Sequence, residues 1–331
     1  MKDFFRNKKK FLLVVMLMVV TLTGCSVPRG QNGKTYVNSI YTNNDVQVKR
    51  GDVDIPDDKG LQKKYKDYKA DDLITIEKTT FSDAMDEGWF NGLIVWPIAF
   101  LINFVADFSD AGIGIIAATF LIQLLIFLFS IKSQVASQRM QSIQPEMNKI
   151  QAKYAGKTDD RSKMQQAQEM QALYSKYKIN PFGTLLVTFI QFPVILGMYQ
   201  ATMRAYSVVT GSFQGINLAK TPIEGFNLGD YWYIVIFVLM VAFQLLSFKM
   251  PQWLQEHRKK KMHVKEKKYA EPKKKGGNGM MGSMNMMMYM STGMIAIFAI
   301  NWPLGMSFYW LVNSLARVIQ NIVIHKFFIK D

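Results

Sequence analysis

The sequence is poor in the residues that build covalent cross-links and metal sites. It has one cysteine and three histidines in 331 residues. A single cysteine cannot form an intramolecular disulfide, and this set leaves little material for a metal site. No glycine-rich phosphate loop and no Ser/His/Asp set is visible, and His257, His263 and His325 lie at or beyond the ends of the apolar stretches. We therefore expect no enzymatic activity, no cofactor and no metal.

The chain is rich in apolar residues and in positive charge. Hydrophobic residues make up 49% of it, yet the formal net charge is +15. A soluble domain of this length would need a far larger core to bury that much apolar surface, whereas a membrane protein gathers apolar residues in spans and charge in loops. In such a protein an excess of Lys and Arg marks cytoplasmic loops and does not indicate readout of nucleic acid. The composition predicts an all-α membrane protein.

The beginning of the chain has the pattern of a signal peptide. Basic residues between Lys2 and Lys10 precede an apolar stretch, Phe11–Val20, that is short for a membrane span. The following Leu22–Cys25 resembles the lipobox of bacterial lipoproteins, in which the cysteine receives a diacylglyceryl group and becomes the new N-terminus. We expect residues 1–24 to be the signal peptide and Cys25 to be lipidated. The alternative is an uncleaved first span with an incidental cysteine.

Two segments are expected outside the bilayer before the first span. Residues 25–80 are polar and mixed in charge, which predicts a largely irregular extracytoplasmic linker. Within residues 81–107, aromatic and apolar residues recur near helical spacing against acidic ones, as in a helix that lies along a membrane surface. Pro97 is expected to bend this helix. A short true span over residues 90–105 is the alternative.

The remaining chain, 108–331, is predicted to form a core of five spans. Each stretch is close to the ~20 residues that cross the hydrocarbon as a helix, and they cover Ala111–Ile131, Phe182–Met203, Tyr231–Phe248, Met284–Ile300 and Leu304–Ile324. Between the first two spans, residues 133–179 predict a helical hairpin made of Ser133–Tyr154 and Arg161–Lys178. Residues 249–280 form a second, strongly basic loop.

The basic residues predict the orientation of the spans. The hairpin and the loop 249–280 are rich in Lys and Arg, whereas residues 205–230 contain only Lys220. By the positive-inside rule the hairpin and the basic loop are cytoplasmic and residues 205–230 face out. Five spans then place the N-terminus outside and the C-terminus in the cytoplasm, in agreement with an exported Cys25.

Polar residues within the predicted spans gather in the cytoplasmic half of the membrane. A polar side chain without a partner is costly in hydrocarbon, and a lipid-facing Arg more so. Polar faces from several helices at one depth predict a hydrated groove that opens to the cytoplasm, lined by Thr119, Gln123, Thr184, Thr188, Gln191, Gln244, Asn313, Arg317 and Gln320.

Two other interpretations of these polar residues remain open. Ser, Thr, Asn and Gln commonly hydrogen-bond across packed spans, so the same residues can hold helices together. A small-solute transporter or channel is the alternative function, and it predicts a polar path continuing into the outer half or inverted repeats, neither of which we find.

The order of these features resembles the YidC/Oxa family of membrane protein insertases, and the lipobox points to its Gram-positive branch. The resemblance covers about residues 81–326 and includes the local strings Ile143–Met147, Ala172–Tyr174, Asn180–Gly183, Gln191–Pro193 and Phe308–Trp310. It implies a chaperone and insertase of the bacterial plasma membrane that accepts nascent membrane proteins, alone or with the Sec translocon. It also implies contact with lipids and with the ribosome or signal recognition particle pathway, for which the basic loop is the candidate if it is not only a topology signal.

The resemblance also identifies one departure. The family typically places an Arg in the first span, where it faces the groove and attracts acidic client tails. The matching position here is Gln123. Our hypothesis is that Arg317, at similar depth on the last span, supplies the charge.

The lipidation of Cys25 can be tested directly. Because Cys25 is the only cysteine, Cys25→Ala is expected to abolish incorporation of radiolabelled palmitate into the protein. The neighbouring Ser26→Ala is the control and should label like the wild type. Undiminished labelling of Cys25→Ala would contradict the assignment.

Overall fold

The computed structural model describes residues 28–30, 32–157, 159–179, 181–261 and 280–328, without the side chains of 181–189, 259, 261 and 280–287. The signal peptide, Cys25 and most of the basic loop lie outside the described residues. The chain divides into two compact units, to which each of the long helices contributes residues. The first unit contains the chain up to Ile122, Phe189–Val238 and Ala299–Val312, and the second contains Gln123–Thr188, Leu239–Phe298 and the chain from Asn313.

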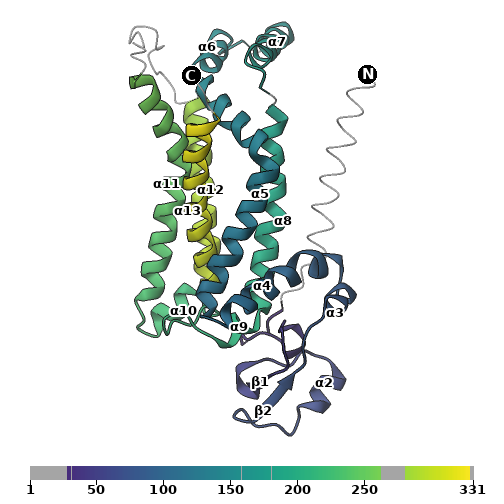
Figure 1. Ribbon diagram of the computed structural model, residues 1–331. Helices are drawn as coiled ribbons and strands as arrows, with labels where there is room; N and C mark the ends of the chain where they lie inside the picture. The colour runs from purple at the N-terminus through teal and green to yellow at the C-terminus, as the bar shows by residue number, and fades with distance from the viewer. Residues whose placement is uncertain (1–27, 31, 158, 180, 262–279, 329–331) are drawn as a thin grey trace. The chain divides into compact units, whose positions relative to one another are not determined.

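The segment expected to be an irregular linker is folded, and that prediction is wrong for its described residues. It forms an antiparallel pair of strands, in which Val48 lies opposite Ile74 and Val46 opposite Ile76. Its elements are η1 (Val37–Ser39), β1 (Val46–Lys49), η2 (Arg50–Asp52), α2 (Lys59–Lys64) and β2 (Leu73–Ile76) (Figure 1).

This small module buries a core that it does not supply alone. Alternate strand residues such as Val48, Ile74 and Ile76 point inward. Val209, from α9 (Tyr206–Thr210), belongs to the same cluster, and Tyr206 packs against it. The few apolar residues of the module therefore suffice because a distant part of the chain completes the core.

The predicted surface helix is present in three pieces, α3 (Phe81–Asp86), a π-helical turn η3 (Asn91–Val95) and α4 (Trp96–Ala106). Thr80 and Asp83 form a capping box at the start of α3. The helix stops before Gly88, whose φ of 139° a residue with a side chain rarely adopts. Pro97 falls in the first turn of α4, where its missing N–H has no cost.

Helices occupy all five predicted spans, and their bounds are α5 (Ala111–Ser142), α8 (Pro181–Arg204), α11 (Trp232–Lys261), α12 (Met280–Asn301) and α13 (Leu304–Phe327). Among the described residues, two helices pass a test of length and apolarity for crossing a membrane, namely Ala111–Ser142 and Trp232–Arg258. α11 continues thirteen residues past the predicted end of its span at Phe248, so the first part of the basic segment is helical.

The helical hairpin between the first two predicted spans differs from its prediction at one end. Residues 133–142 extend α5, and the hairpin itself consists of α6 (Gln144–Lys153) and α7 (Asp160–Lys176), which lie side by side (Figure 1). The prediction of one helix over Ser133–Tyr154 is therefore wrong. Pro145 explains the break at Ile143, because a proline inside a continuous helix would lack its N–H and clash with the carbonyl four residues earlier, whereas the first turn of α6 accommodates it. Ile143, Met147, Leu173 and Ile179 form the buried core of the hairpin.

The last two helices meet at Pro303, as expected. The backbone N–H groups of Leu304 and Gly305 donate to the carbonyls of Lys220 and Leu218 at 2.8 and 2.9 Å. A helix normally leaves its first amides unpaired. Here the loop after α9 satisfies those of α13, which ties both segments together within the first unit.

The close approach of α4 to α5 generates a prediction. A Cβ at Gly114 would collide with the backbone carbonyl oxygen of Ile102, whereas a Cβ at Gly293 in α12 would meet nothing. Gly114→Ala is expected to destabilise the protein by about 1–3 kcal/mol, through overpacking. Gly293→Ala is the control and should be neutral or stabilise by up to about 1 kcal/mol. Thermal unfolding in detergent measures both, and equal midpoints would contradict the close contact.

Candidate functional site

Two helices of the second unit are joined through a pair of buried amides. The Nε2 of Gln123 on α5 donates to the Oδ1 of Asn313 on α13 at 2.5 Å. Two turns further along α13, the Nε2 of Gln320 donates to the backbone carbonyl of Gln123 at 3.2 Å. Gln123 is 3% exposed and Asn313 2%. Asn313 and Gln320 lie on one face of α13, so two positions of this helix contact the same residue of α5.

The next residue of α13 extends the contact to a third helix. Ser314 donates its hydroxyl to the Oε1 of Gln244 on α11 at 2.5 Å. Gln244 is 2% exposed, and Ser247 donates to its backbone carbonyl at 2.9 Å. Adjacent residues on a helix point in different directions, so Asn313 and Ser314 serve α5 and α11 respectively.

A second set of amides, which sequence reasoning missed, lies nearer the hairpin end of the same helices. The Nε2 of Gln138 on α5 donates to the Oδ1 and the backbone carbonyl of Asn321 on α13, at 3.1 and 3.2 Å. Gln255 of α11 donates to the backbone carbonyl of Gln138 at 2.9 Å. The sequence could have indicated these residues. Gln138 lies about four turns beyond Gln123 and so on the same face of α5, and Asn321 directly follows the predicted groove residue Gln320.

Two predicted groove residues belong to the first unit. Thr119 is buried and donates its hydroxyl to the carbonyl of Ile115 in its own helix at 2.6 Å. Gln191 of α8 donates to the hydroxyl of Tyr309 on α13 at 3.2 Å. Both polar groups are satisfied within the protein.

The structure thus brings Gln123, Asn313 and Gln320 together and pairs Gln244 with Ser314. Arg317 and Gln320 are half-buried on α13. The side chains of Thr184 and Thr188 lie outside the described residues, so their predicted role stays a prediction. The observed pairs match what interhelical hydrogen bonding requires, and each neutral pair contributes only about 1 kcal/mol net.

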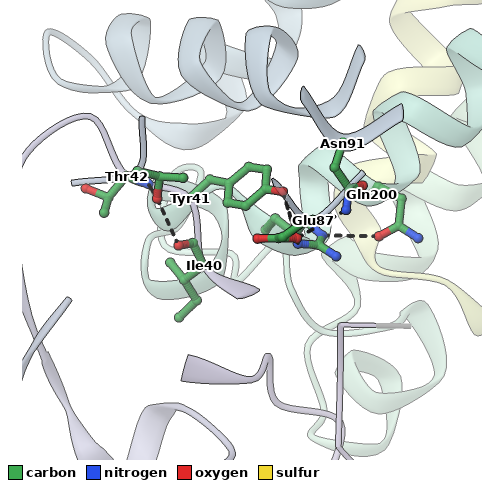
Figure 2. A network of polar contacts seen from close by, with 8 residues as sticks. Ile40, Tyr41, Thr42, Glu87, Asn91 and Gln200 are labelled. Carbon is green, nitrogen blue, oxygen red and sulfur yellow. Dashed lines mark hydrogen bonds and ion pairs between the residues drawn. The ribbon is translucent and has the colours of Figure 1, made fainter. Parts of the chain in front are cut away.

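The first unit contains a different kind of polar cluster, centred on an ion pair that the sequence did not reveal (Figure 2). The Nη1 of Arg204, at the end of α8, lies 2.6 Å from the Oε2 of Glu87, and the Arg204 side chain is only 3% exposed. The Tyr41 hydroxyl donates to the same Glu87 oxygen at 3.0 Å and accepts from Arg204 at 3.2 Å. Asn91 donates to Glu87, and Gln200 accepts from Arg204 Nε.

The surroundings keep the phenol of this cluster neutral. Burial raises the pKa of Tyr41, and the nearby Glu87 carboxylate raises it further, although Arg204 acts in the opposite direction. Tyr41 therefore remains a hydrogen-bond donor to Glu87 at neutral pH. The guanidinium also lies 5.1 Å from the centre of the Tyr41 ring, a favourable cation–π distance.

Neither cluster has the composition of a metal or nucleophilic site. Among the described residues no group of three or more His, Cys, Asp or Glu could hold a metal ion. The amide network can exchange hydrogen-bond partners, and the ion pair can hold segments in place.

Long apolar helices joined by buried amides define the class as a helical membrane protein. The family model described as 60Kd inner membrane protein matches residues 103–331. The chain is 32% identical over 254 residues to membrane protein insertase YidC 1 of Streptococcus pyogenes serotype M3, which covers 76% of this chain and 80% of the relative. It is 32% identical to membrane protein insertase MisCA of Bacillus subtilis strain 168, over 70% of this chain and 77% of the relative. The chain belongs to the YidC family, as the resemblance predicted.

The paired amides make a testable prediction. Gln123→Leu leaves the Asn313 oxygen without its donor, at an expected cost of about 1–3 kcal/mol of stability. Replacing both partners, Gln123→Leu with Asn313→Leu, should recover most of that loss, because no buried polar atom remains unpaired. Thermal unfolding of the two singles and the double in detergent tests the coupling, with Leu124→Ala as a control on the same helix. Losses that simply add would contradict the pairing.

Proposed function

We propose that this chain is a membrane protein insertase that moves polar segments of client proteins through a hydrophilic groove open to the cytoplasm. The observation that carries the proposal is the match of residues 103–331 to the insertase family together with the uncharged amide network at the centre of its helices. In this proposal α5, α8, α11, α12 and α13 are five transmembrane helices. They contain 22 to 32 residues each, and about 20 suffice to cross the hydrocarbon.

Apolar side chains on the outside of these helices support a membrane environment. Among the side chains that the structure describes, large exposed hydrophobic residues are found on α5, α11, α12 and α13, and they include Phe120, Leu124, Leu128, Phe129, Val238, Leu239, Met294, Ile297, Ile319 and Ile322. In water this surface would be unfavourable, whereas lipid tails solvate it.

The surface helix is proposed to lie in the outer interface of the membrane. Its exposed residues include Trp89, Leu93 and Phe104. Rings form a continuous series along it, from Phe81 through Trp96 and Phe100 to Phe104 and Phe108, with neighbouring centroids 5.3 to 6.3 Å apart. Aromatic side chains favour the headgroup level of a bilayer.

The proposed location is the bacterial plasma membrane, with the N-terminus outside, anchored by a lipid on Cys25, and the C-terminus in the cytoplasm. The distribution of Lys and Arg supports this orientation. The proposed clients are nascent membrane proteins. Contacts with the Sec translocon, the ribosome or the signal recognition particle pathway are part of the proposal, with the basic segment after α11 as the surface for the ribosome.

The mechanism follows from the low net energy of a neutral hydrogen bond. When a client's polar flank enters, it replaces one partner in pairs such as Gln123–Asn313 and Gln244–Ser314, so that bonds are exchanged and not lost. Residues proposed to offer such bonds along the groove are Thr119, Gln123, Thr184, Thr188, Gln191, Gln244, Asn313, Arg317 and Gln320. Transfer of the client's own apolar segment into lipid supplies the driving force, at about 25 cal/mol per Å². No covalent step is required, so the protein acts as a chaperone and not as an enzyme.

Arg317 is proposed to supply the groove's positive charge. It lies on α13 between Asn313 and Gln320, on the face that carries the amide network, and it is half-buried. At that depth a guanidinium would attract an acidic client tail more strongly than an amide would.

Reconstitution tests the function and the role of the charge. Purified protein in liposomes is expected to protect a small single-spanning reporter from added protease, above the level of empty liposomes. Arg317→Ala should lower the insertion of a reporter with an acidic tail by roughly tenfold, the loss expected for one charge-assisted hydrogen bond. Leu315→Ala, an exposed residue of the same helix, is the control.

Two results would count against these assignments. Protection by wild-type protein no greater than that of empty liposomes would contradict insertion by the chain alone. Full insertion by Arg317→Ala, together with a strong loss in Gln123→Arg, would exclude Arg317 as the source of the charge.

A further inference from the structure

The folded N-terminal module lies outside the region that the family model describes. The match to the family begins at residue 103, whereas the first unit of the structure includes an ordered module that begins at residue 28. The module contacts the end of α8, which belongs to the matched region, and also the surface helix, most of which precedes residue 103.

Residues 35–41 of the module attach along the end of α8. The Thr35 hydroxyl donates to the carbonyl of Met203 at 2.9 Å. The Tyr41 N–H donates to the carbonyl of Arg204 at 2.7 Å, and its own carbonyl accepts from the N–H of Tyr206 at 3.0 Å. This is a strand-like attachment, made by the backbone on both sides of Ala205.

Residues 35–41 also contact the surface helix. The Tyr41 carbonyl accepts a second hydrogen bond, from the Nδ2 of Asn103 on α4, at 2.8 Å. The Oδ1 of Asn103 in turn accepts from the N–H and the hydroxyl of Ser207, at 3.0 and 2.8 Å. Asn103 is buried, and each of its polar atoms is used.

Arg204 adds an ion pair to these hydrogen bonds. Its guanidinium binds Glu87, in the break between α3 and η3, and the Tyr41 hydroxyl at the same time (Figure 2). A buried Arg with a carboxylate partner has a strong preference for one geometry, because the guanidinium, only 3% exposed here, would otherwise be left without solvent or counter-ion. The ion pair therefore fixes the position of the surface helix relative to the end of α8.

The surface helix is itself packed on the family core. Gly114 of α5 lies against the backbone of Ile102, and Gly197 of α8 lies against the side chains of Ile94 and Ile98. A helix that contacts both α5 and α8 within the first unit influences how those two helices pack there.

We propose that residues 28–80 act as an intramolecular strap that holds the aromatic surface helix against α8, and that Arg204 is the positioning residue of this strap. The strap is a part of the fold and not a linker, since its core is completed by Val209 and the backbone of Tyr41 is hydrogen-bonded to Arg204 and Tyr206. The positioning itself does not depend on the proposed function. Its effect on client insertion does.

Hydrogen exchange of the full-length protein in nanodiscs tests the proposal. Arg204→Gln removes the charge and Tyr41→Phe removes only the bridging hydroxyl, so the milder variant remains informative if the first misfolds. Amides of residues 35–42 and 81–106 are expected to exchange about tenfold faster in Arg204→Gln, as for a lost buried charge pair, and less so in Tyr41→Phe. Amides of α11 and α13 should be unchanged. Arg204→Lys, which keeps the charge without the planar fork, should lie between Arg204→Gln and wild type.

Lys49→Gln is the matched control. It removes a cation from the strap itself, and the ion pair that Lys49 makes with Asp71 is exposed and 4.0 Å long. Its exchange pattern should equal that of wild type.

Three outcomes would overturn the proposal. Faster exchange confined to residues 35–76, with 81–106 unchanged, would show an appendage that does not hold the surface helix, as expected of a separate docking domain. Uniformly faster exchange in Tyr41→Phe would show a general loss of stability. Wild-type exchange in Arg204→Gln would exclude Arg204 as the positioning residue.

The insertion assay separates this proposal from the proposed function. Insertion is expected to fall in the order wild type, Arg204→Lys, Arg204→Gln. If the wild-type protein inserts no reporter, the proposed function fails, whereas the exchange pattern still decides whether the strap holds the surface helix.

Discussion

A polar group taken out of water must find a partner inside the protein, and the organisation of both units follows from this constraint. Gln123, Gln244 and Asn313 are almost fully buried, and each has a protein partner within hydrogen-bonding distance. In apolar surroundings an unpaired amide costs several kcal/mol by transfer scales, or about 1–3 by mutation. The partners of these residues are therefore as important to the structure as its apolar packing.

The two units meet the constraint by different chemistry. In the second unit the pairs are neutral, and a neutral pair can be exchanged for another at little net cost. In the first unit the central pair is ionic, and separating Arg204 from Glu87 would leave a charge without water or counter-ion. Exchangeable bonds suit the groove that we propose for polar segments of client proteins. An ionic contact suits a junction that keeps one geometry, as the contacts of Tyr41 and Asn103 also require.

Features that depend on local sequence could be predicted. The five long helices follow from apolar runs of sufficient length, and the break at Pro303 from the missing N–H of proline. The hairpin follows from two polar, helix-forming stretches separated by Gly156 and by Asp159, which begins the second helix. The module at residues 28–80 could not be predicted, because its core is completed by Val209, more than a hundred residues later. Nor could the ion pair between Glu87 and Arg204, which are 117 positions apart and carry no common motif. The polar stripe on the predicted spans identified Gln123, Gln244 and Asn313, but not which residues they would bind.

The sequence by itself determined the class of protein, the positions of its long helices and several of the polar residues buried among them, because hydrophobicity and helix periodicity are properties of neighbouring residues. Only the tertiary structure decided that Asn313 binds Gln123 while Ser314 binds Gln244, and that Tyr41 meets Arg204. A hydrogen bond depends on distance and angle between particular atoms, and these are set when helices pack, not when they form.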